Sequence, residues 1–427
     1  MAQTVTPPRG MRDFLPAEKA RREHALSVIR GVYATHGFDE IETPVMEDSS
    51  RLHAGLGGDN EKLAFAVMKR GITPDDLAAA AASGDALSLA DLGLRYDLTV
   101  PLARFYATHR AALPPVFRAI QIAPVWRAER PQKGRYRQFV QCDIDIIGEP
   151  GHLAELELLT ATVAALDALG LEGCRIRLND RRILARILGS WGVTEELRER
   201  ALITIDKLDK LGPDGVAAEL ATLGVDRAGV ADELRALAAA DWHLADGRPS
   251  QTGDSVPPPA WLDLDAYRDL IALRDAVPGT GIDFDPTLVR GMGYYTGTIF
   301  EIAHPDYGYS LGGGGRYDHM IGRFLGQEVP ACGFSIGFER IVDLLAVRDE
   351  GRPRAVALVY DGDVAPAELL VLKHELVASG VRVRFERRVK NLRALLDRVT
   401  TDGFDAWAPV TAETTDAASL AFRDLGE

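Results

Sequence analysis

The densest group of side chains able to do chemistry lies between residues 127 and 141, in the run Arg-Ala-Glu-Arg-Pro-Gln-Lys-Gly-Arg-Tyr-Arg-Gln-Phe-Val-Gln. Five cations surround one carboxylate here, although the 427-residue chain carries a formal net charge of -14. The cations are Arg127, Arg130, Lys133, Arg135 and Arg137, and the carboxylate is Glu129. Cations this close repel one another unless water solvates them or a polyanion binds them. The run therefore predicts a site for a triphosphate or a nucleic acid strand.

The segments on either side of Pro-Gln-Lys-Gly have the pattern of two strands joined by a turn. Side chains alternate between the faces of a strand, so Arg127 and Glu129 share one face of the first strand. In the second strand, one face carries Val140, Cys142, Ile144 and Ile146, and the other carries Phe139, Gln141, Asp143 and Asp145. A carboxylate that faces a buried sheet needs a partner, so the polar face predicts a functional site built on the sheet. An exposed antiparallel face with solvated charges is the alternative.

The same run resembles motif 2 of class II aminoacyl-tRNA synthetases, in the form found in the histidyl-tRNA synthetase family. Two further segments resemble the histidine-specific elements of that family: Leu-Val-Arg-Gly-Met-Gly-Tyr-Tyr-Thr-Gly at 288–297 and Gly-Gly-Gly-Gly-Arg-Tyr-Asp at 312–318. The likeness runs from Pro8 to about residue 348 and continues more weakly to the C-terminus. Three separated motifs in the right order are far more specific than one glycine-rich loop.

The resemblance implies an α+β fold, with a class II synthetase-like antiparallel sheet core flanked by helices, a helical insertion and a small C-terminal α/β domain. We expect the catalytic core over residues 1–180 and 282–348, and the insertion over 181–281, where the sequence becomes rich in Ala, Leu, Arg and Asp. A short anticodon-binding-like domain is expected over 353–427. The run Asp349-Glu350-Gly351-Arg352-Pro353 suits the linker before it.

Hydrophobic spacing and punctuating residues predict the main elements of these parts. A helix is expected over 17–36, ending at Gly37, and a core-facing helical stripe at Leu153, Leu156, Leu159, Val163 and Leu166. The segment 41–45, Ile-Glu-Thr-Pro-Val, resembles the strand of motif 1, the dimer-forming element of class II enzymes. Residues 94–101 predict a strand that enters a helix. In the C-terminal part we expect strands at 355–359 and 381–385 and helices at 365–379 and 390–400.

The reaction that the resemblance implies has two steps: ATP and an amino acid form an adenylate, and a ribose hydroxyl of tRNA then attacks it. The protein must position anionic reactants and stabilise charge on the α-phosphate, a task that suits the planar, always charged arginine fork. The resemblance assigns catalysis to Arg127, Arg290 and Arg340. It assigns ATP binding to Arg127, Glu129, Arg135, Phe139 and Arg340, the last in the first turn of a helix after Gly337, where phosphate binds readily.

A site that hydrogen-bonds an imidazole nitrogen rejects flat analogues by about 10⁴-fold, because its own polar groups would be left unpaired. The resemblance assigns histidine binding to Asp97, Leu98, Thr99, Arg127, Gln141, Asp145, Arg290, Tyr294 and Tyr295, and tRNA acceptor contacts to Arg130 and Gln132. Asp145 is also singled out by the strand alternation alone. The chain departs from the family pattern at Gly293, where an aspartate is usual, and at Val140, where many relatives have histidine.

Composition limits the other classes of protein. The chain is 46% hydrophobic and 26% charged, as in ordinary globular proteins, and we find no apolar run that could span a bilayer or form a signal peptide. Three cysteines and nine histidines are scattered, which predicts neither a disulfide framework nor a protein-held metal. We expect a cytoplasmic protein whose ATP brings Mg²⁺ with it, and the resemblance implies a homodimer.

A second basic cluster lies in the C-terminal part, where the ending is short compared with the family's. Its members are Arg382, Arg384, Arg387, Arg388, Lys390 and Arg393. The cluster suits an RNA stem or anticodon, or a solvated surface of a strand and helix.

The resemblance implies a histidine–tRNA ligase that uses L-histidine, ATP and histidine tRNA. One alternative is a histidine-binding regulatory subunit of ATP phosphoribosyltransferase, and another is a paralogue that activates histidine without charging tRNA. A regulator has no need of the ATP arginines, so the presence of Arg127, Arg135, Arg290 and Arg340 favours a ligase. The short C-terminal ending keeps the paralogue open.

Overall fold

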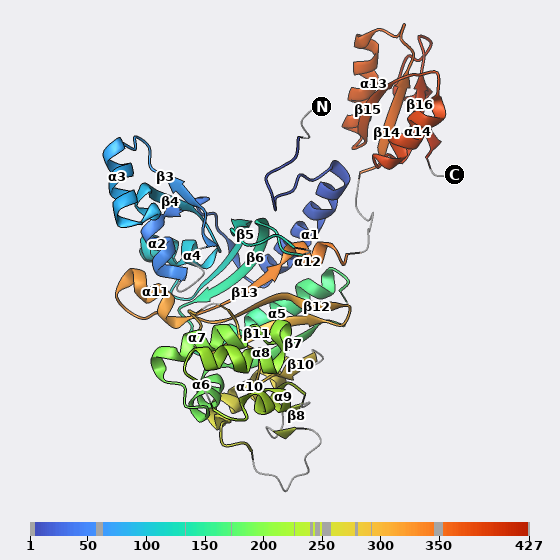
Figure 1. Cartoon of the computed structure of the whole chain (residues 1–427). Coiled ribbons are helices and arrows are strands. Elements are labelled where there is room, and N and C mark those ends of the chain that lie inside the picture. The colour runs from blue at the N-terminus through green and yellow to red at the C-terminus, as the bar shows by residue number, and fades with distance from the viewer. Residues whose placement is uncertain are drawn as a thin grey trace. The chain divides into compact units, whose positions relative to one another are not determined.

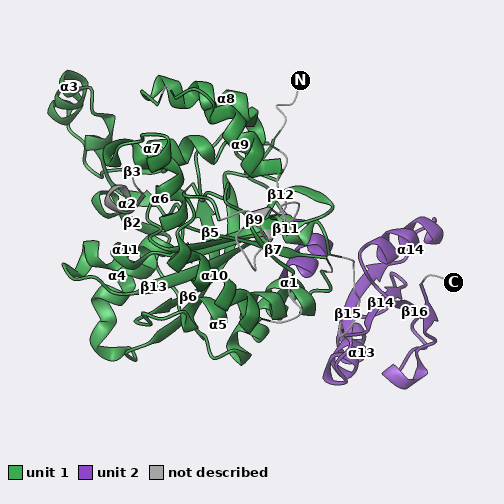
Figure 2. Ribbon diagram, turned by 90° about the horizontal axis from the view of Figure 1, so that it is seen from below, with its two compact units in different colours: residues 1–13, 24–345 green, residues 14–23, 346–427 purple. Residues whose placement is uncertain are grey.

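The computed structural model describes residues 5–56, 63–132, 134–171, 173–225, 227–239, 242–243, 248–249, 258–277, 281–291, 293–345 and 353–425. The chain forms two compact units, residues 1–13 with 24–345 and residues 14–23 with 346–427 (Figure 2). The division of the first unit into core and insertion stays a prediction. Lys133 and residues 349–352 of the expected linker lie outside the described residues. No helix in the described part of the chain is long and apolar enough to cross a membrane.

An eight-stranded sheet forms the centre of the first unit, in the order β1-β5-β6-β13-β12-β11-β7-β10 (Figure 1). Its strands are β1 Asp39–Glu40, β5 Phe117–Trp126, β6 Gln138–Ile147, β7 Arg175–Asp180, β10 Gly281–Phe284, β11 Thr298–His304, β12 Tyr307–Arg316 and β13 Ala331–Gly337. The inner neighbours are antiparallel, which confirms the predicted core. The outermost pairs, β1 with β5 and β10 with β7, are parallel, an arrangement that the sequence did not indicate.

Helices and two small sheets complete the part of the chain before residue 346. The helices are α1 Pro16–Thr35, α2 Ser49–Leu56, α3 Pro74–Ser83, α4 Thr99–His109, α5 Leu153–Ala168, α6 Arg181–Ser190, α7 Glu195–Ile205, α8 Leu208–Thr222, α9 Val230–Ala239, α10 Leu264–Ala276, α11 Asp318–Leu325 and α12 Phe338–Val342. The small sheets are β2 Met46–Asp48 with β4 Ala90–Leu94 and β3 Ala66–Met68, and β8 Trp242–His243 with β9 Arg248–Pro249. The run of helices from α6 to α10 confirms that the chain after residue 181 is mainly helical, as predicted.

The helices α1 and α5 and the strand β6 contribute to the main hydrophobic core. Cys142, Ile144 and Ile146 of β6 are fully buried, which confirms the predicted apolar face. The stripe predicted on α5 is partly wrong, since Leu153 is 50% exposed while Ala154 and other neighbours are buried. This helix is apolar around much of its circumference, so residue type alone did not indicate which face packs on the sheet.

The strand predicted over residues 41–45 is wrong, because the parallel pairing with β5 ends at Glu40. The carbonyls of Thr43 and Pro44 instead accept hydrogen bonds from the Arg95 guanidinium, at 2.8 and 3.4 Å. Pro44 has no N–H to donate to a ladder, so an arginine side chain replaces a neighbouring strand here. The strand expected from residue 94 onward likewise ends at Leu94, five residues before α4 begins.

The second unit contains a four-stranded sheet, in the order β15-β14-β16-β17. Its elements after residue 346 are β14 Ala355–Tyr360, α13 Pro366–Ala378, β15 Arg382–Arg387, α14 Leu392–Thr401, β16 Ala406–Val410 and β17 Arg423–Asp424. This succession confirms the predicted α/β alternation. In the basic cluster, Arg384 pairs with Asp402 at 2.8 Å and Arg388 with Asp361 at 3.2 Å, so part of its charge is neutralised within the unit.

The four glycines at 312–315 lie in the second half of strand β12, between β11 and β13, rather than in the tight hairpin turn that such a run often makes. A side chain at Gly314 would overlap the carbonyl oxygen of Gly333 on the neighbouring strand. A side chain at Gly313 would lie 2.7 Å from the Arg290 guanidinium carbon. The glycines therefore let the strands pair closely and leave room for the Arg290 side chain against β12.

Replacing Gly314 with alanine is expected to lower the free energy of unfolding by about 3 kcal/mol or to prevent folding, because neither strand backbone can move aside. Urea unfolding followed by circular dichroism measures this change. Gly189→Ala in α6 is the matched control, since nothing lies within 4 Å of its added carbon and alanine favours a helix. Equal stability of the two variants would contradict the packing described for β12.

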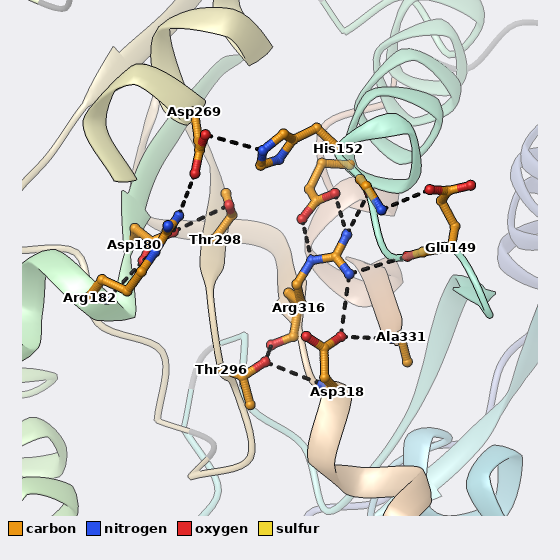
Figure 3. A network of polar contacts seen from close by, with 12 residues as sticks. Glu149, His152, Asp180, Arg182, Asp269, Thr296, Thr298, Arg316, Asp318 and Ala331 are labelled. Carbon is orange, nitrogen blue, oxygen red and sulfur yellow. Dashed lines mark hydrogen bonds and ion pairs between the residues drawn. The ribbon is translucent and has the colours of Figure 1, made fainter. Parts of the chain in front are cut away.

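The end of β12 is held by a buried polar network around Arg316 (Figure 3). Its guanidinium bonds both carboxylate oxygens of Glu155, at 2.7 and 2.6 Å, and the carbonyl of Gly151 at 2.9 Å. Asp318 accepts from Arg316 at 3.3 Å and from the Ala331 N–H at 2.9 Å. The network ties β12 to α5, α11 and β13, and so fixes the backbone on both sides of Tyr317.

Candidate active site

One large cavity of the first unit, about 680 Å³, brings together most of the predicted site residues. It is lined by parts of β6, β12 and β13, by the chain after β5, by the segment around Arg290 and by residues 205–210. The predicted residues in its lining are Asp97, Thr99, Arg127, Glu129, Arg135, Phe139, Gln141, Asp145, Arg290, Tyr294, Tyr295 and Arg340. Residues from widely separated parts of the sequence therefore share one concave surface.

Arg127 lies one residue beyond the end of β5, at one wall of the cavity. Its Nε donates to the Tyr96 carbonyl at 3.1 Å, and its guanidinium lies over the rings of Tyr96 and Phe139, at 4.4 and 5.0 Å from their centroids. Glu129, two residues on, accepts a bond from Arg135 at 3.3 Å. Contact with two rings helps to hold the Arg127 guanidinium at this wall, where it can bind an anion.

Arg290 and Arg340 approach the same cavity from other elements. Arg290 donates to Glu301 of β11 at 2.7 Å, while its buried Nε has no hydrogen-bond partner among the described residues. Arg340 of α12 bonds the Ser310 carbonyl and lies over the Tyr309 ring at 5.1 Å. Burial, together with the positive charges of Arg135 and Arg290, lowers the pKa of Arg340. Cations that raise one another's energy in this way create a strong site for a polyanion.

Three buried carboxyl groups form an acidic part of the cavity: Asp97, Asp143 and Asp145. Burial raises the pKa of Asp97, and the Oδ2 atom of this residue has no partner among the described residues. Burial and the negative charge of Asp145 raise the pKa of Asp143 well above its ordinary value. Burial raises the pKa of Asp145 to about 7, although the Tyr317 hydroxyl donates to it at 2.6 Å. Such a cluster favours a ligand with positive charge or N–H donors.

Aromatic side chains stand beside these carboxyl groups. The Tyr294 ring lies 4.9 Å from that of Tyr295 and 6.0 Å from that of Tyr317, in both cases edge to face. Burial raises the pKa of Tyr295 to about 12, so its hydroxyl stays protonated and able to donate. Flat walls with hydrogen-bonding edges suit a small heteroaromatic ring.

Three predicted residues are absent from the lining of this cavity. Leu98 is fully buried in front of α4, where its carbonyl accepts from Gln121 at 3.0 Å, so its side chain serves packing. Arg130 and Gln132 are exposed in the loop between β5 and β6. Backbone bonds between Gln132 and Arg135 close this loop, which confirms the predicted turn.

The structure also brings in residues that the sequence did not assign. Tyr317, Ser335 and Glu301 line the cavity, as does Asp206, which follows α7 and interacts electrostatically with Arg290. Asp143 carried a signal, since strand alternation placed it on the polar face with Gln141 and Asp145. Tyr317 also carried a signal, since it belongs to the segment 312–318 that resembles a histidine-specific element, although no role was assigned to it. Ser335, Glu301 and Asp206 carried none, because only the pairing of distant strands and helices places them here.

Comparison with known proteins gives the same family as the motifs in the sequence. The family model described as histidyl-tRNA synthetase matches residues 10–341. Histidine–tRNA ligase of Leifsonia xyli subsp. xyli is 61% identical over 433 aligned residues, covering 100% of both chains. Probable histidine–tRNA ligase of Tropheryma whipplei is 43% identical, covering 94% of this chain and 95% of that protein.

Solved structures share the fold at lower identity. Histidyl-tRNA synthetase from Nostoc sp. PCC 7120 has a TM-score of 0.74 at 24% identity, covering 99% of this chain and 95% of the other. An ATP phosphoribosyltransferase regulatory subunit/histidyl-tRNA synthetase from Bacillus halodurans C has a TM-score of 0.73 at 20% identity, covering 97% and 100%. The sheet and its flanking helices are those of a class II aminoacyl-tRNA synthetase. The chain belongs to the histidyl-tRNA synthetase family.

Proposed function

We propose that this chain is a histidine–tRNA ligase, which activates L-histidine with ATP in the cavity described above and transfers it to the 3' end of histidine tRNA. Membership of the family and a full-length relative named as this ligase support the proposal. The main structural support for the mechanism is that arginines and buried carboxyl groups line the same cavity. Neither alternative function is favoured by these relatives, which cover 100% and 94% of this chain.

ATP would bind at the cationic part of the cavity. We place its phosphates among Arg127, Arg135, Arg290 and Arg340, and its adenine near Phe139 and Glu129, a ring and an acceptor that suit the base and its amino group. Mg²⁺ would arrive with the triphosphate as part of the substrate. Guanidinium groups that already face the cavity stabilise charge on the α-phosphate without reorganising during the reaction.

Histidine would bind at the acidic part of the cavity. The resemblance groups Asp145 with the residues of the α-amino group, Asp97, Thr99 and Gln141. We keep these three for the α-ammonium group and assign Asp145 instead to the imidazole, together with Tyr294 and Tyr295. The carboxylate would then point toward Arg127 and Arg290, where it meets the α-phosphate. The reaction needs no covalent intermediate on the enzyme, so positioning and electrostatics supply the rate enhancement.

Two assays test the function directly. Histidine-dependent exchange of pyrophosphate into ATP measures activation, and charging of histidine tRNA measures transfer. We expect both activities. Absence of exchange would support the regulatory alternative, whereas exchange without charging would support the paralogue.

Alanine at Arg130 or Gln132 is expected to lower tRNA charging about tenfold while it changes pyrophosphate exchange less than twofold. Both residues are exposed in the loop outside the cavity lining, where they can reach a tRNA end without touching ATP or histidine. Single-turnover transfer from preformed adenylate provides the measurement, and Arg110→Ala, also at an exposed position, is a control for loss of surface charge. An equal loss in both assays would rule out a role confined to tRNA.

We further propose that the protein works as a homodimer in the cytoplasm, as the likeness of 41–45 to motif 1 and the role of the family in translation suggest. Sedimentation velocity tests the first point. The C-terminal unit, with its partly paired arginines, is the candidate for contacts to the tRNA anticodon.

A further inference from the structure

The amide of Gln141 has an orientation that its surroundings dictate. Its Nε2 donates to the Ser335 hydroxyl oxygen at 3.0 Å and lies 3.4 Å from both carboxyl oxygens of Asp143. Ser335 and Asp143 are directly opposite each other on the neighbouring strands β13 and β6. Both N–H groups of the amide are therefore directed into the sheet, toward acceptors.

The same contacts leave the other end of the amide open. The Oε1 atom of Gln141 is buried and has no hydrogen-bond partner among the described residues. The whole residue is only 9% exposed, and it lines the cavity. The Ser335 hydroxyl cannot supply the missing donor, because its hydrogen bonds Asp143. A buried acceptor without a partner costs about 1–3 kcal/mol, which a ligand N–H can recover.

A second buried oxygen without a partner among the described residues, on Asp97, supports the same conclusion about which donor is missing. Asp97 is 2% exposed, and its Oδ2 is likewise buried without a partner among the described residues. Its other carboxyl oxygen accepts the Val100 N–H at 3.1 Å. Two residues of the cavity lining each hold a buried oxygen without a partner among the described residues, which calls for a ligand group with several N–H bonds and a positive charge, such as an ammonium group.

We propose that Asp143 and Ser335 are positioning residues that hold the Gln141 amide with its oxygen toward the α-ammonium group of the bound amino acid. The inference rests on the proposed function, in which the cavity binds histidine. Asp143 can accept the amide N–H in either protonation state, because one carboxyl oxygen remains an acceptor when the other carries a proton. Neither residue needs to touch the substrate.

Asp143→Asn tests this inference because it places an NH₂ group where the Gln141 NH₂ now finds acceptors. The amide of Gln141 is then expected to turn over and present its own NH₂ to the ligand ammonium, with a loss of attraction. Ser335→Ala removes one acceptor without changing any charge, so it separates amide orientation from the simple loss of a negative charge. We expect the same effect from this second variant, but smaller.

The measurement is isothermal titration calorimetry of the full-length protein with three ligands. L-histidine and L-histidinol carry the amine, whereas 3-(imidazol-4-yl)propanoate lacks it. In Asp143→Asn we expect dissociation constants at least tenfold higher for the two amines and changed less than threefold for the propanoate. Ser335→Ala should weaken the amines about threefold and leave the propanoate unchanged.

Asp180→Asn is the matched control, because Asp180 is a fully buried acid of the same sheet that bonds Arg182 at 2.9 Å, outside the cavity lining. It should destabilise the fold without altering the preference for amines. Equal weakening of all three ligands, or no weakening, in Asp143→Asn or in Ser335→Ala would overturn the proposal. If Asp143→Asn fails to fold, the result for Ser335→Ala decides alone. Failure of the unaltered protein to bind L-histidine would instead overturn the proposed function, and the inference with it.

Discussion

Replacing Arg290 with alanine is expected to reduce histidine-dependent pyrophosphate exchange by roughly 10²- to 10³-fold, the usual effect of removing one preorganised donor to a developing charge. The Nε atom of Arg290 is buried at the cavity with no partner among the described residues, so it is free to bond a phosphate or carboxylate oxygen. Exchange rates at saturating and at low ATP and histidine would show whether the loss lies in the chemical step or in binding.

The fold is expected to survive this substitution. Glu301, the ion-pair partner of Arg290, keeps its second partner Arg177 at 3.0 Å and is not left as an unpaired buried charge. Arg175→Ala is the matched control, since this arginine also pairs with a carboxylate, Asp283 at 2.5 Å, but lies outside the cavity lining. An unchanged exchange rate in Arg290→Ala would remove this residue from the catalytic group. A fall in the melting temperature large enough to unfold the variant under assay conditions would instead explain the lost activity by a structural role of Arg290.

Asp145→Asn is expected to abolish most histidine activation and at the same time to make the unliganded protein more stable at neutral and alkaline pH. Burial raises the pKa of Asp145 to about 7 from the ordinary value of 3.8, so folding disfavours the ionised carboxylate. An asparagine of the same shape escapes that cost, and its oxygen can still accept the Tyr317 hydroxyl. The gain at pH 8 is expected to be about 2–4 kcal/mol.

The pH dependence of this gain follows from the direction of the shift. Below about pH 4 the carboxyl is protonated in both the folded and the unfolded protein, and the variant gains nothing. Between about pH 4 and pH 7 the unfolded chain ionises while the folded protein keeps its proton, so this group makes the unaltered protein progressively less stable as the pH rises. Above about pH 7 the difference levels off.

Chemical unfolding of both proteins at several pH values, together with exchange assays, measures the two effects. A stability difference that does not vary between pH 4 and pH 8 would contradict the raised pKa. Full activity of Asp145→Asn would remove this residue from the imidazole site. Opposite effects on stability and activity are expected of a residue whose burial serves a ligand rather than the fold.

Much of the local structure followed from the sequence. The alternation in 138–147 identified both the buried face with Ile144 and the polar face with Asp145, because a strand has a fixed two-residue period. The turn before Arg135 and the α/β alternation after residue 354 were equally predictable from hydrophobic runs and glycine positions. Predictions failed where tertiary partners replace the usual ones, as when Arg95 bonds the carbonyls of Thr43 and Pro44, or where a helix such as α5 is apolar on several faces.

The motifs around Arg127, Arg290 and Gly312 were enough to determine the family and most members of the site. Residue types at fixed spacings in a sequence directly indicate which chemical groups a site can contain. Only the tertiary structure decided how these members meet. Antiparallel pairing of β6 with β13 brings Ser335 against Asp143, and the tight approach at Gly333 lets Tyr317 reach Asp145. Such contacts join residues almost two hundred positions apart, and no local period or propensity carries information over that distance.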